Sequence, residues 1–312
     1  MEEVFRYINK IREKINSARK QNILSRDQYL WNQLCSSLDI IEDTTKATID
    51  YLDIKSEEKL GLKYIYVFGI LQILFVQQDA IKHMGEALNI EIEFDDELLK
   101  IRDIRNNSIG HPTKRGKGKS TTYNFIARVY LSHKKLTLMS VSPKLEKSTS
   151  FLHYDIHNLI DKQKKSLLPI LEEVLNKLEK EEMEHINKFK DDKLVECFHP
   201  TLNYHFQKVY ESRWGNTPLD VSKIDFTIIE NALSLFKAKL EEREILEAYD
   251  GVTIVLEELE YPLTKLKEYF NRESTLEPEN ITIYNHYIES KFGELIEMAK
   301  ELDENYSNKN NA

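Results

Sequence analysis

Arg105, Asn106 and His111 are the residues of this 312-residue sequence whose types and spacing suit catalysis best. Arginine carries a permanent positive charge and a planar set of donors that fits phosphate oxygens. Histidine accepts or donates a proton near neutral pH. Together they are sufficient for a reaction that needs no metal, the cleavage of RNA by its own ribose 2′-hydroxyl, in which histidine moves a proton and arginine stabilises the phosphate charge. Asn106 could orient either side chain or the substrate.

The spacing of these residues places them at the end of a predicted helix. Arg105 and His111 are separated by roughly 240° around a regular helix, so they would not share a face if the helix continued. Gly110 and Pro112 are predicted to end it, and we expect the distorted end to bring His111 toward Arg105. A purely structural interpretation stays open, because cations are favoured at helix C-termini and Gly-His-Pro is an ordinary helix stop.

A cationic segment follows the motif directly. Residues 100–150 contain twelve Lys and Arg against two acidic residues, a net charge of +10 in a chain whose total is −9. The loop 113–120 has no apolar residue. We expect RNA phosphates to be contacted by Arg102 and by the basic residues of this loop, Lys114, Arg115, Lys117 and Lys119. Such contacts would position RNA without specifying its sequence. The alternatives are a solvated loop and, for Arg102, a salt bridge.

Other features argue against metal, membrane and disulfide chemistry. Cys35 and Cys197 fit neither a metal spacing nor a disulfide framework, which favours a reducing, cytoplasmic compartment. The N-terminus does not resemble a signal peptide. The most apolar stretch, residues 64–76, is shorter than a bilayer requires, so no membrane association is expected.

The remaining histidines of this region are assigned no site. His153 and His157 have the spacing of a ligand pair on a predicted helix, but no third ligand lies nearby, so we expect no metal and no cofactor. His133 is expected to be solvent-exposed in a turn.

Apolar periodicity predicts a mainly all-α protein. Glycine (9) and proline (7) are too scarce for a sandwich or barrel. Ser25 is expected to cap the second helix and Pro169 to kink or interrupt a later one. Three- and four-residue apolar spacing predicts helices over residues 2–20, 26–53, 58–88, 95–110, 150–189, 202–214, 222–246, 252–270 and 279–305. The helix over 58–88 is apolar nearly all round between residues 64 and 76 and is expected in the centre of a bundle.

The domain organisation follows from these elements. Residues 123–141 alternate apolar and polar side chains, which predicts a small β-hairpin inserted after the motif. We expect a helical domain over 1–189 that contains this hairpin and the basic loop. A second helical domain is expected over 190–306, followed by a disordered tail over 307–312.

The segment Arg105-Asn106-x4-His111, followed by Pro112, resembles the motif of HEPN domains. That motif is an arginine, a polar residue and a short spacer to a histidine. HEPN proteins are all-α bundles that usually dimerise so that two motifs face one composite cleft. Many are metal-independent endoribonucleases of toxin–antitoxin, abortive-infection and CRISPR-linked defence. The resemblance covers roughly residues 25–185, and the rest of the chain resembles no family that we identify.

The resemblance implies that Arg105 and His111 are catalytic and that Asn106 supports them. The expected reaction leaves a 2′,3′-cyclic phosphate and a 5′-hydroxyl. The expected partners are RNA, a second copy of the chain and an antitoxin or other defence protein. No tyrosine follows His111 closely, so the branch with an AMPylated tyrosine is a poor match, and the hairpin is an addition to the simple bundle. The alternative is a non-catalytic HEPN module that binds RNA, a nucleotide or a protein partner.

Overall fold

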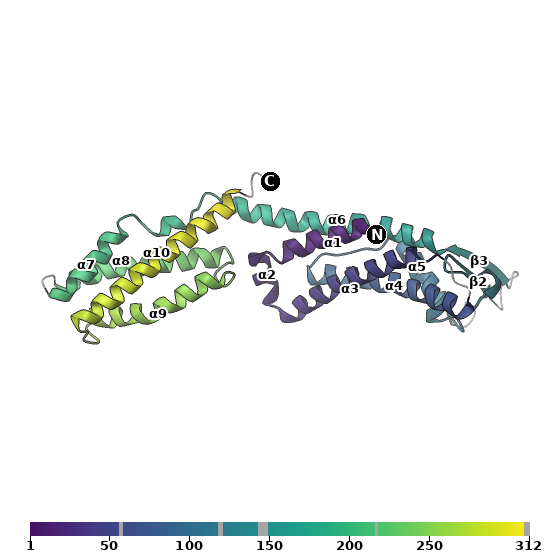
Figure 1. The fold of residues 1–312 in the computed structure, drawn as a ribbon, viewed down its shortest axis with the longest axis horizontal. Helices are drawn as coiled ribbons and strands as arrows, with labels where there is room; N and C mark the ends of the chain where they lie inside the picture. The colour runs from purple at the N-terminus through teal and green to yellow at the C-terminus, as the bar shows by residue number, and fades with distance from the viewer. Residues whose placement is uncertain (56–58, 118–120, 143–148, 216–217, 309–312) are drawn as a thin grey trace. The chain divides into compact units, whose positions relative to one another are not determined.

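The computed structural model describes residues 1–55, 59–117, 121–142, 149–215 and 218–308 (Figure 1). The chain is mainly helical and includes one small three-stranded antiparallel sheet in its described part, which confirms the predicted fold class. It divides into two compact units, residues 1–16 with 24–179 and residues 17–23 with 180–312. The division falls inside helix α6 (Ile156–Phe189), about ten residues before the boundary expected at residue 189.

The beginning of the chain differs from the prediction. The first expected helix is two helices, α1 (Glu2–Ile15) and α2 (Ala18–Ser25). Helix α3 (Gln28–Leu52) is capped by Asp27 and not by Ser25. The Asp27 carboxylate accepts hydrogen bonds from the backbone N–H groups of Tyr29 and Leu30 at 3.0 and 3.1 Å, which satisfies two of the donors that a helix start leaves unpaired.

Helix α4 (Leu60–Ala87) is the long apolar helix, but one side of its first turns is exposed. Val67, Leu71 and Leu74 are fully buried against the first unit's core, whereas Ile65 is 64% exposed. The expectation of burial all round is therefore wrong for the first turns. At 28 residues α4 is also the one described helix long and apolar enough to cross a bilayer, a test that core helices of soluble proteins pass as well.

A hydrogen-bonded cluster of glutamines lies within the core of the first unit. Gln77, Gln78 and Gln163 are each 0% exposed. The Gln163 side chain donates to Gln77 Oε1 at 2.9 Å and accepts from Gln78 at 2.8 Å. Gln77 in turn donates to the buried hydroxyl of Thr45 at 2.9 Å. The cluster ties α3, α4 and α6 together through buried hydrogen bonds, although Gln78 Oε1 accepts none among the described residues.

Three antiparallel strands follow the motif where a two-stranded hairpin was expected. They are β1 (Tyr123–Ile126), β2 (Lys135–Val141) and β3 (Thr149–Asp155), in the order β1-β2-β3. The hairpin prediction is right for β1 and β2. The helix predicted over residues 150–155 is wrong. These residues belong to β3, which pairs with β2 along its whole length, from Lys135 opposite Asp155 to Val141 opposite Thr149.

Helix α6 continues through Pro169, so the expected interruption is absent. Proline removes one backbone hydrogen bond from a helix interior. Leu167 and Leu171 on either side are 0% exposed, and their burial holds the helix together across the missing bond.

The described part of the second unit contains four further α-helices around its own apolar core. They are α7 (Leu202–Glu211), α8 (Leu219–Glu242), α9 (Asp250–Phe270) and α10 (Pro278–Asn308). All four agree with the predicted helices to within a few residues at most ends. Ser307 and Asn308 belong to α10, so the expected disordered tail is wrong there, and residues 309–312 lie outside the described residues.

Candidate functional site

Helix α5 (Asp96–Arg105) presents the two arginines of the motif region. Asp95 caps its start by accepting a hydrogen bond from the Leu98 N–H at 2.9 Å. Ile101 and Ile104 are buried, which fixes the rotation of the helix on the first unit's core. Arg102 and Arg105 consequently lie in the last turn, beside α4.

The end of α5 widens into a π-helical turn over Asn106–Gly110. The His111 N–H donates to the Asn106 carbonyl oxygen, five residues back, at 2.7 Å. Short π-helical turns inside or after α-helices are rare and are frequent at functional sites. This π-helical turn is the distorted helix end that the sequence predicts before His111.

Neutral groups hold the guanidinium of Arg105. Its Nε and Nη2 donate to Gln72 Oε1 at 3.0 and 2.8 Å, and its Nη1 donates to Asn106 Oδ1 at 3.0 Å. Its central carbon lies 4.4 Å from the centre of the Phe75 ring. Gln72 and Phe75 are separated by one turn of α4 and were not among the predicted residues. Four contacts therefore fix the group without cancelling its charge.

The neighbouring arginines are paired with carboxylates. Arg102 Nη1 lies 2.7 Å from Asp79 Oδ1, and Arg115 Nη2 lies 2.9 Å from Asp103 Oδ1. Arg105 has no carboxylate within ion-pair distance in the described part of the chain. Of Arg102, Arg105 and Arg115, it is therefore the one whose positive charge remains available to a ligand anion.

Gly110 leaves room for this arrangement. A Cβ atom at Gly110 would lie 2.9 Å from Arg105 Nη1 and 3.2 Å from Asn106 Oδ1. The guanidinium thus rests directly on the residue that precedes His111. The side chain of His111 is exposed, and its ring has no hydrogen-bond partner among the residues that the structure describes.

The basic loop is partly built into the fold. Arg115 and Thr122 exchange backbone hydrogen bonds at 3.0 and 2.8 Å, and the Arg115 side chain also donates to Asn107 at 2.6 Å. Lys114 and Lys117 are exposed. Lys119 lies outside the described residues. The structure therefore brings Arg102, Arg105 and Arg115 to one end of α5, with Lys114 on the exposed loop beside them.

The other histidines lie elsewhere than expected. His133 is 7% exposed, because the turn before β2 folds against Tyr51, whose hydroxyl donates to the His133 carbonyl oxygen. His153 belongs to β3 and His157 to the first turn of α6, so they are not a pair on one helix. Burial and then Lys134 lower the pKa of His157. No metal-binding cluster of three or more ligands occurs among the described residues.

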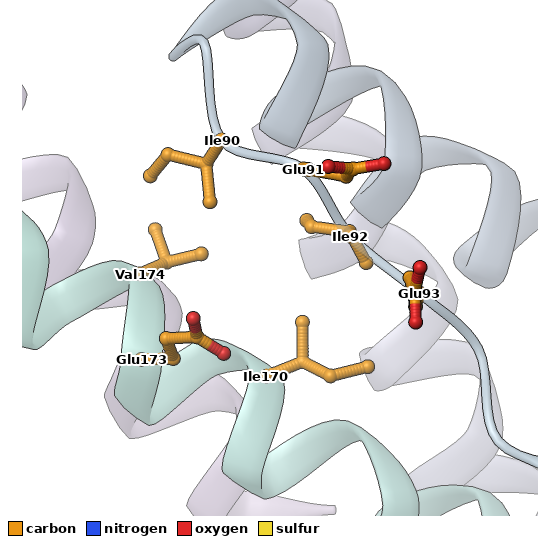
Figure 2. A pocket seen from close by; sticks show the side chains of 7 residues that line it. All are labelled: Ile90, Glu91, Ile92, Glu93, Ile170, Glu173 and Val174. Carbon is orange, nitrogen blue, oxygen red and sulfur yellow. The ribbon is translucent and has the colours of Figure 1, made fainter.

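A pocket of about 300 Å³ lies between the segment 90–93 and α6 (Figure 2). Ile90, Ile92, Ile170 and Val174 supply its apolar lining, and its charged groups are carboxylates: Glu91, Glu93 and Glu173. It contains no residue of the motif and no basic side chain. The pocket therefore suits neither a phosphate nor the predicted chemistry.

Compared with protein-family models, with curated proteins and with solved structures, the chain shows no significant similarity to any of them.

Proposed function

We propose that the protein is a metal-independent endoribonuclease of HEPN type. One observation carries the proposal: the Arg105 guanidinium is held rigidly by Gln72, Asn106 and Phe75, keeps its charge, and rests on Gly110 beside His111. A fixed and uncompensated arginine beside an exposed histidine provides phosphate binding and proton transfer in one place.

The reaction follows from these two groups. The ribose 2′-oxygen attacks the adjacent phosphorus, and the bond from phosphorus to the 5′-oxygen of the next nucleotide breaks. His111 removes the proton of the attacking hydroxyl or delivers one to the leaving oxygen, while Arg105 stabilises the additional negative charge on the phosphate oxygens. The products are a 2′,3′-cyclic phosphate and a 5′-hydroxyl.

A homodimer would supply a second histidine to the same cleft. The exposed side of α4 supports this part of the proposal. Leu62 and Ile65 are exposed, and a Cβ atom at Gly69 would meet nothing within 4 Å. These residues continue along the helix to Gln72, which holds Arg105. A second copy covering this apolar face would bring a second motif toward the first, with one histidine acting as base and the other as acid.

The alternative is a non-catalytic module that binds RNA, a nucleotide or a protein partner. The observation that favours it is the His111 ring, which no other described side chain orients. Catalytic histidines usually have such an orienting partner, although apo sites are often loosely arranged. A binding module would use the same arginine and would not need the histidine.

The test is cleavage of a labelled RNA pool in EDTA by the wild type, Arg105→Ala and His111→Ala. Arg6→Ala and His83→Ala, two exposed positions in the same unit, serve as matched controls. We expect cleavage with cyclic-phosphate ends by the wild type and both controls, and none by the two site variants. RNA binding without cleavage by any of the proteins, with His111→Ala binding as well as the wild type, would favour the binding module.

A separate measurement addresses the composite cleft. Ile65→Glu should shift the protein to a monomer in sedimentation and abolish cleavage, whereas Tyr29→Glu, which charges an exposed position on α3, should change neither. Cleavage activity that stays proportional to monomer concentration would contradict the dimeric site.

A further inference from the structure

One face of the sheet carries a row of large side chains that remain exposed. Phe125 of β1, Met139 of β2 and Phe151 of β3 are directly opposite one another in the register. Directly opposite residues of antiparallel strands project from the same face. Phe125 is 52% and Phe151 55% exposed, whereas Leu136 and Leu138, on the other face, are fully buried. The sheet therefore covers the core with one face and presents two phenylalanine rings to solvent with the other.

Further aromatic and polar side chains extend this row in both directions. Tyr123 lies opposite Val141 at the end of the sheet where β1 begins. At the other end Thr137 lies opposite His153 and is hydrogen-bonded to its ring at 3.0 Å. Tyr130, which is 60% exposed, meets the His153 ring edge-on with the ring centres 6.3 Å apart. We call this face, with Tyr123, Phe125, Tyr130, Met139, Phe151 and His153, the aromatic face.

The segments that precede and connect the strands carry exposed cations. Lys114, Arg128 and Lys134 are exposed, and none of them has a carboxylate partner in the described part of the chain. The described strands contain one acidic residue, Asp155, and it lies opposite Lys135 in the register. Exposed rings bordered by uncompensated cations suit a polyanion that also offers flat apolar groups. Nucleic acid has both properties, in its phosphates and its bases.

The aromatic face is continuous with the motif. The Asn124 N–H of β1 donates to the carbonyl oxygen of Pro112, the residue after His111, at 2.8 Å. Arg115 and Thr122 exchange two backbone hydrogen bonds directly before β1. The first strand therefore lies against the residue that follows His111. An RNA strand with one phosphate at Arg105 would need to extend past this strand to reach the aromatic face.

We infer that the aromatic face binds unpaired bases of single-stranded RNA by stacking on Phe125 and Phe151. This inference rests on the endoribonuclease function proposed above and adds a substrate class to it. The two rings are separated by two strand spacings, roughly 10 Å, so each can hold its own base. Bases in a duplex are stacked on each other and do not offer their faces, which restricts this contact to loops, ends and unpaired strands.

The test uses His111→Ala protein, so that the RNA stays intact, and two probes of about 12 nucleotides: oligouridine and an abasic ribose-phosphate chain of the same length. We expect oligouridine to bind about tenfold tighter or more, because stacking on an aromatic side chain contributes that much per base. Adding Phe125→Leu and Phe151→Leu should remove most of this difference in affinity and leave the affinity for the abasic probe unchanged. Adding Phe125→Tyr and Phe151→Tyr should preserve it.

Three results would overturn the inference. The first is equal affinity of the parent protein for the two probes. The second is undiminished oligouridine binding by the leucine pair, whose half-exposed positions leave the fold intact, as circular dichroism should verify. The third is conversion of a dimer to a monomer by the leucine pair, which would assign the face to a second copy. The readout is base-dependent binding, so the binding test remains interpretable if the protein cleaves no RNA. Conversely, a negative result in the binding test would not contradict cleavage by Arg105 and His111.

Discussion

Arg105 and Gln72 are joined by a two-pronged hydrogen bond in which Nε and Nη2 of the arginine share one amide oxygen, at 3.0 and 2.8 Å. A carboxylate at this position would accept the same two bonds and would also neutralise the arginine. The nearby Arg102 is neutralised by such a carboxylate, because its Nη1 lies 2.7 Å from Asp79 Oδ1. The choice of an amide over a carboxylate is therefore what keeps a fixed positive charge at the motif.

Replacing Gln72→Glu should abolish this charge with little change in shape. We expect RNA affinity to fall about tenfold or more and the salt dependence of binding to weaken by about one phosphate contact, while the melting temperature stays the same or rises. Filter binding across a salt series measures the effect. Gln28→Glu, an exposed position on α3, adds the same charge elsewhere and should bind like the wild type. Equal loss in both variants would mean that only net charge matters.

Gly110→Ala should damage the site without damaging the fold. The added Cβ atom would lie 2.9 Å from Arg105 Nη1, so the guanidinium must shift away from Gln72 and Asn106. We expect RNA cleavage to fall by about tenfold or more, with the free energy of unfolding changed by less than about 1 kcal/mol. Gly61→Ala, where no atom lies within 4 Å, is the control and should be fully active. An unchanged cleavage rate in Gly110→Ala would show that the position of Arg105 is unimportant.

Gly85→Ala should instead destabilise the first unit. A Cβ atom there would lie 2.5 Å from Ile92 Cδ1 and 2.7 Å from the Ile90 carbonyl oxygen, and backbone cannot move aside as easily as a side-chain end. We expect urea unfolding to report a loss of about 1–3 kcal/mol. Gly61→Ala again provides the comparison and should be neutral or slightly stabilising. Equal stability of the two variants would contradict the close contact.

His185 should make the second unit sensitive to mild acid. Burial, and then the charge of Arg19, lower its pKa from 6.5 to about 4. Between these values the unfolded chain binds more protons than the folded one, so stability is complete above pH 6.5 and is lost as the pH falls toward 4. By pH 5 the loss from this residue is about 2 kcal/mol.

The measurement is urea unfolding at pH 7 and pH 5 of the wild type and His185→Gln. The wild type should lose more stability than the variant over this interval, because glutamine does not titrate. His286→Gln, a change at an exposed histidine of the same unit, should lose as much as the wild type. Identical losses in the wild type and His185→Gln would show that His185 is protonated with equal ease in both states.

The helices could largely be predicted because their signals are local. In α9 the apolar residues recur every three or four positions, and Asp250 begins the helix after a polar break, so the predicted and observed spans differ by two residues. Strand β3 carried no such signal. Phe151 and Leu152 are adjacent and both apolar, which hides the alternation, and the strand exists because β2 offers it a partner. The interruption predicted at Pro169 is absent for a related reason, since the packing of Leu167 and Leu171 holds the helix.

The candidate site likewise contains residues that the sequence predicts and residues that only the fold brings together. Arg105, Asn106 and His111 are close in sequence, so their shared position at a helix end followed from spacing alone. Gln72 and Phe75 lie about thirty residues earlier, in a helix whose apolar pattern gave them no distinction. The ion pairs of Arg102 with Asp79 and of Arg115 with Asp103 also depend on how α5 and the loop are placed. Charge totals predicted a cationic region, and only the fold separates its paired charges from its free ones.

The glutamine cluster constrains how this sequence can evolve. Gln163 is hydrogen-bonded to both Gln77 and Gln78, and all three are inaccessible to water. An apolar replacement of one member leaves the others with unpaired buried amides, which costs about 1–3 kcal/mol for each unsatisfied group. A single substitution in the cluster is therefore destabilising, although simultaneous replacement of all three glutamines by apolar residues of the same shape would be tolerated. Divergent descendants should keep the three glutamines together or lose them together.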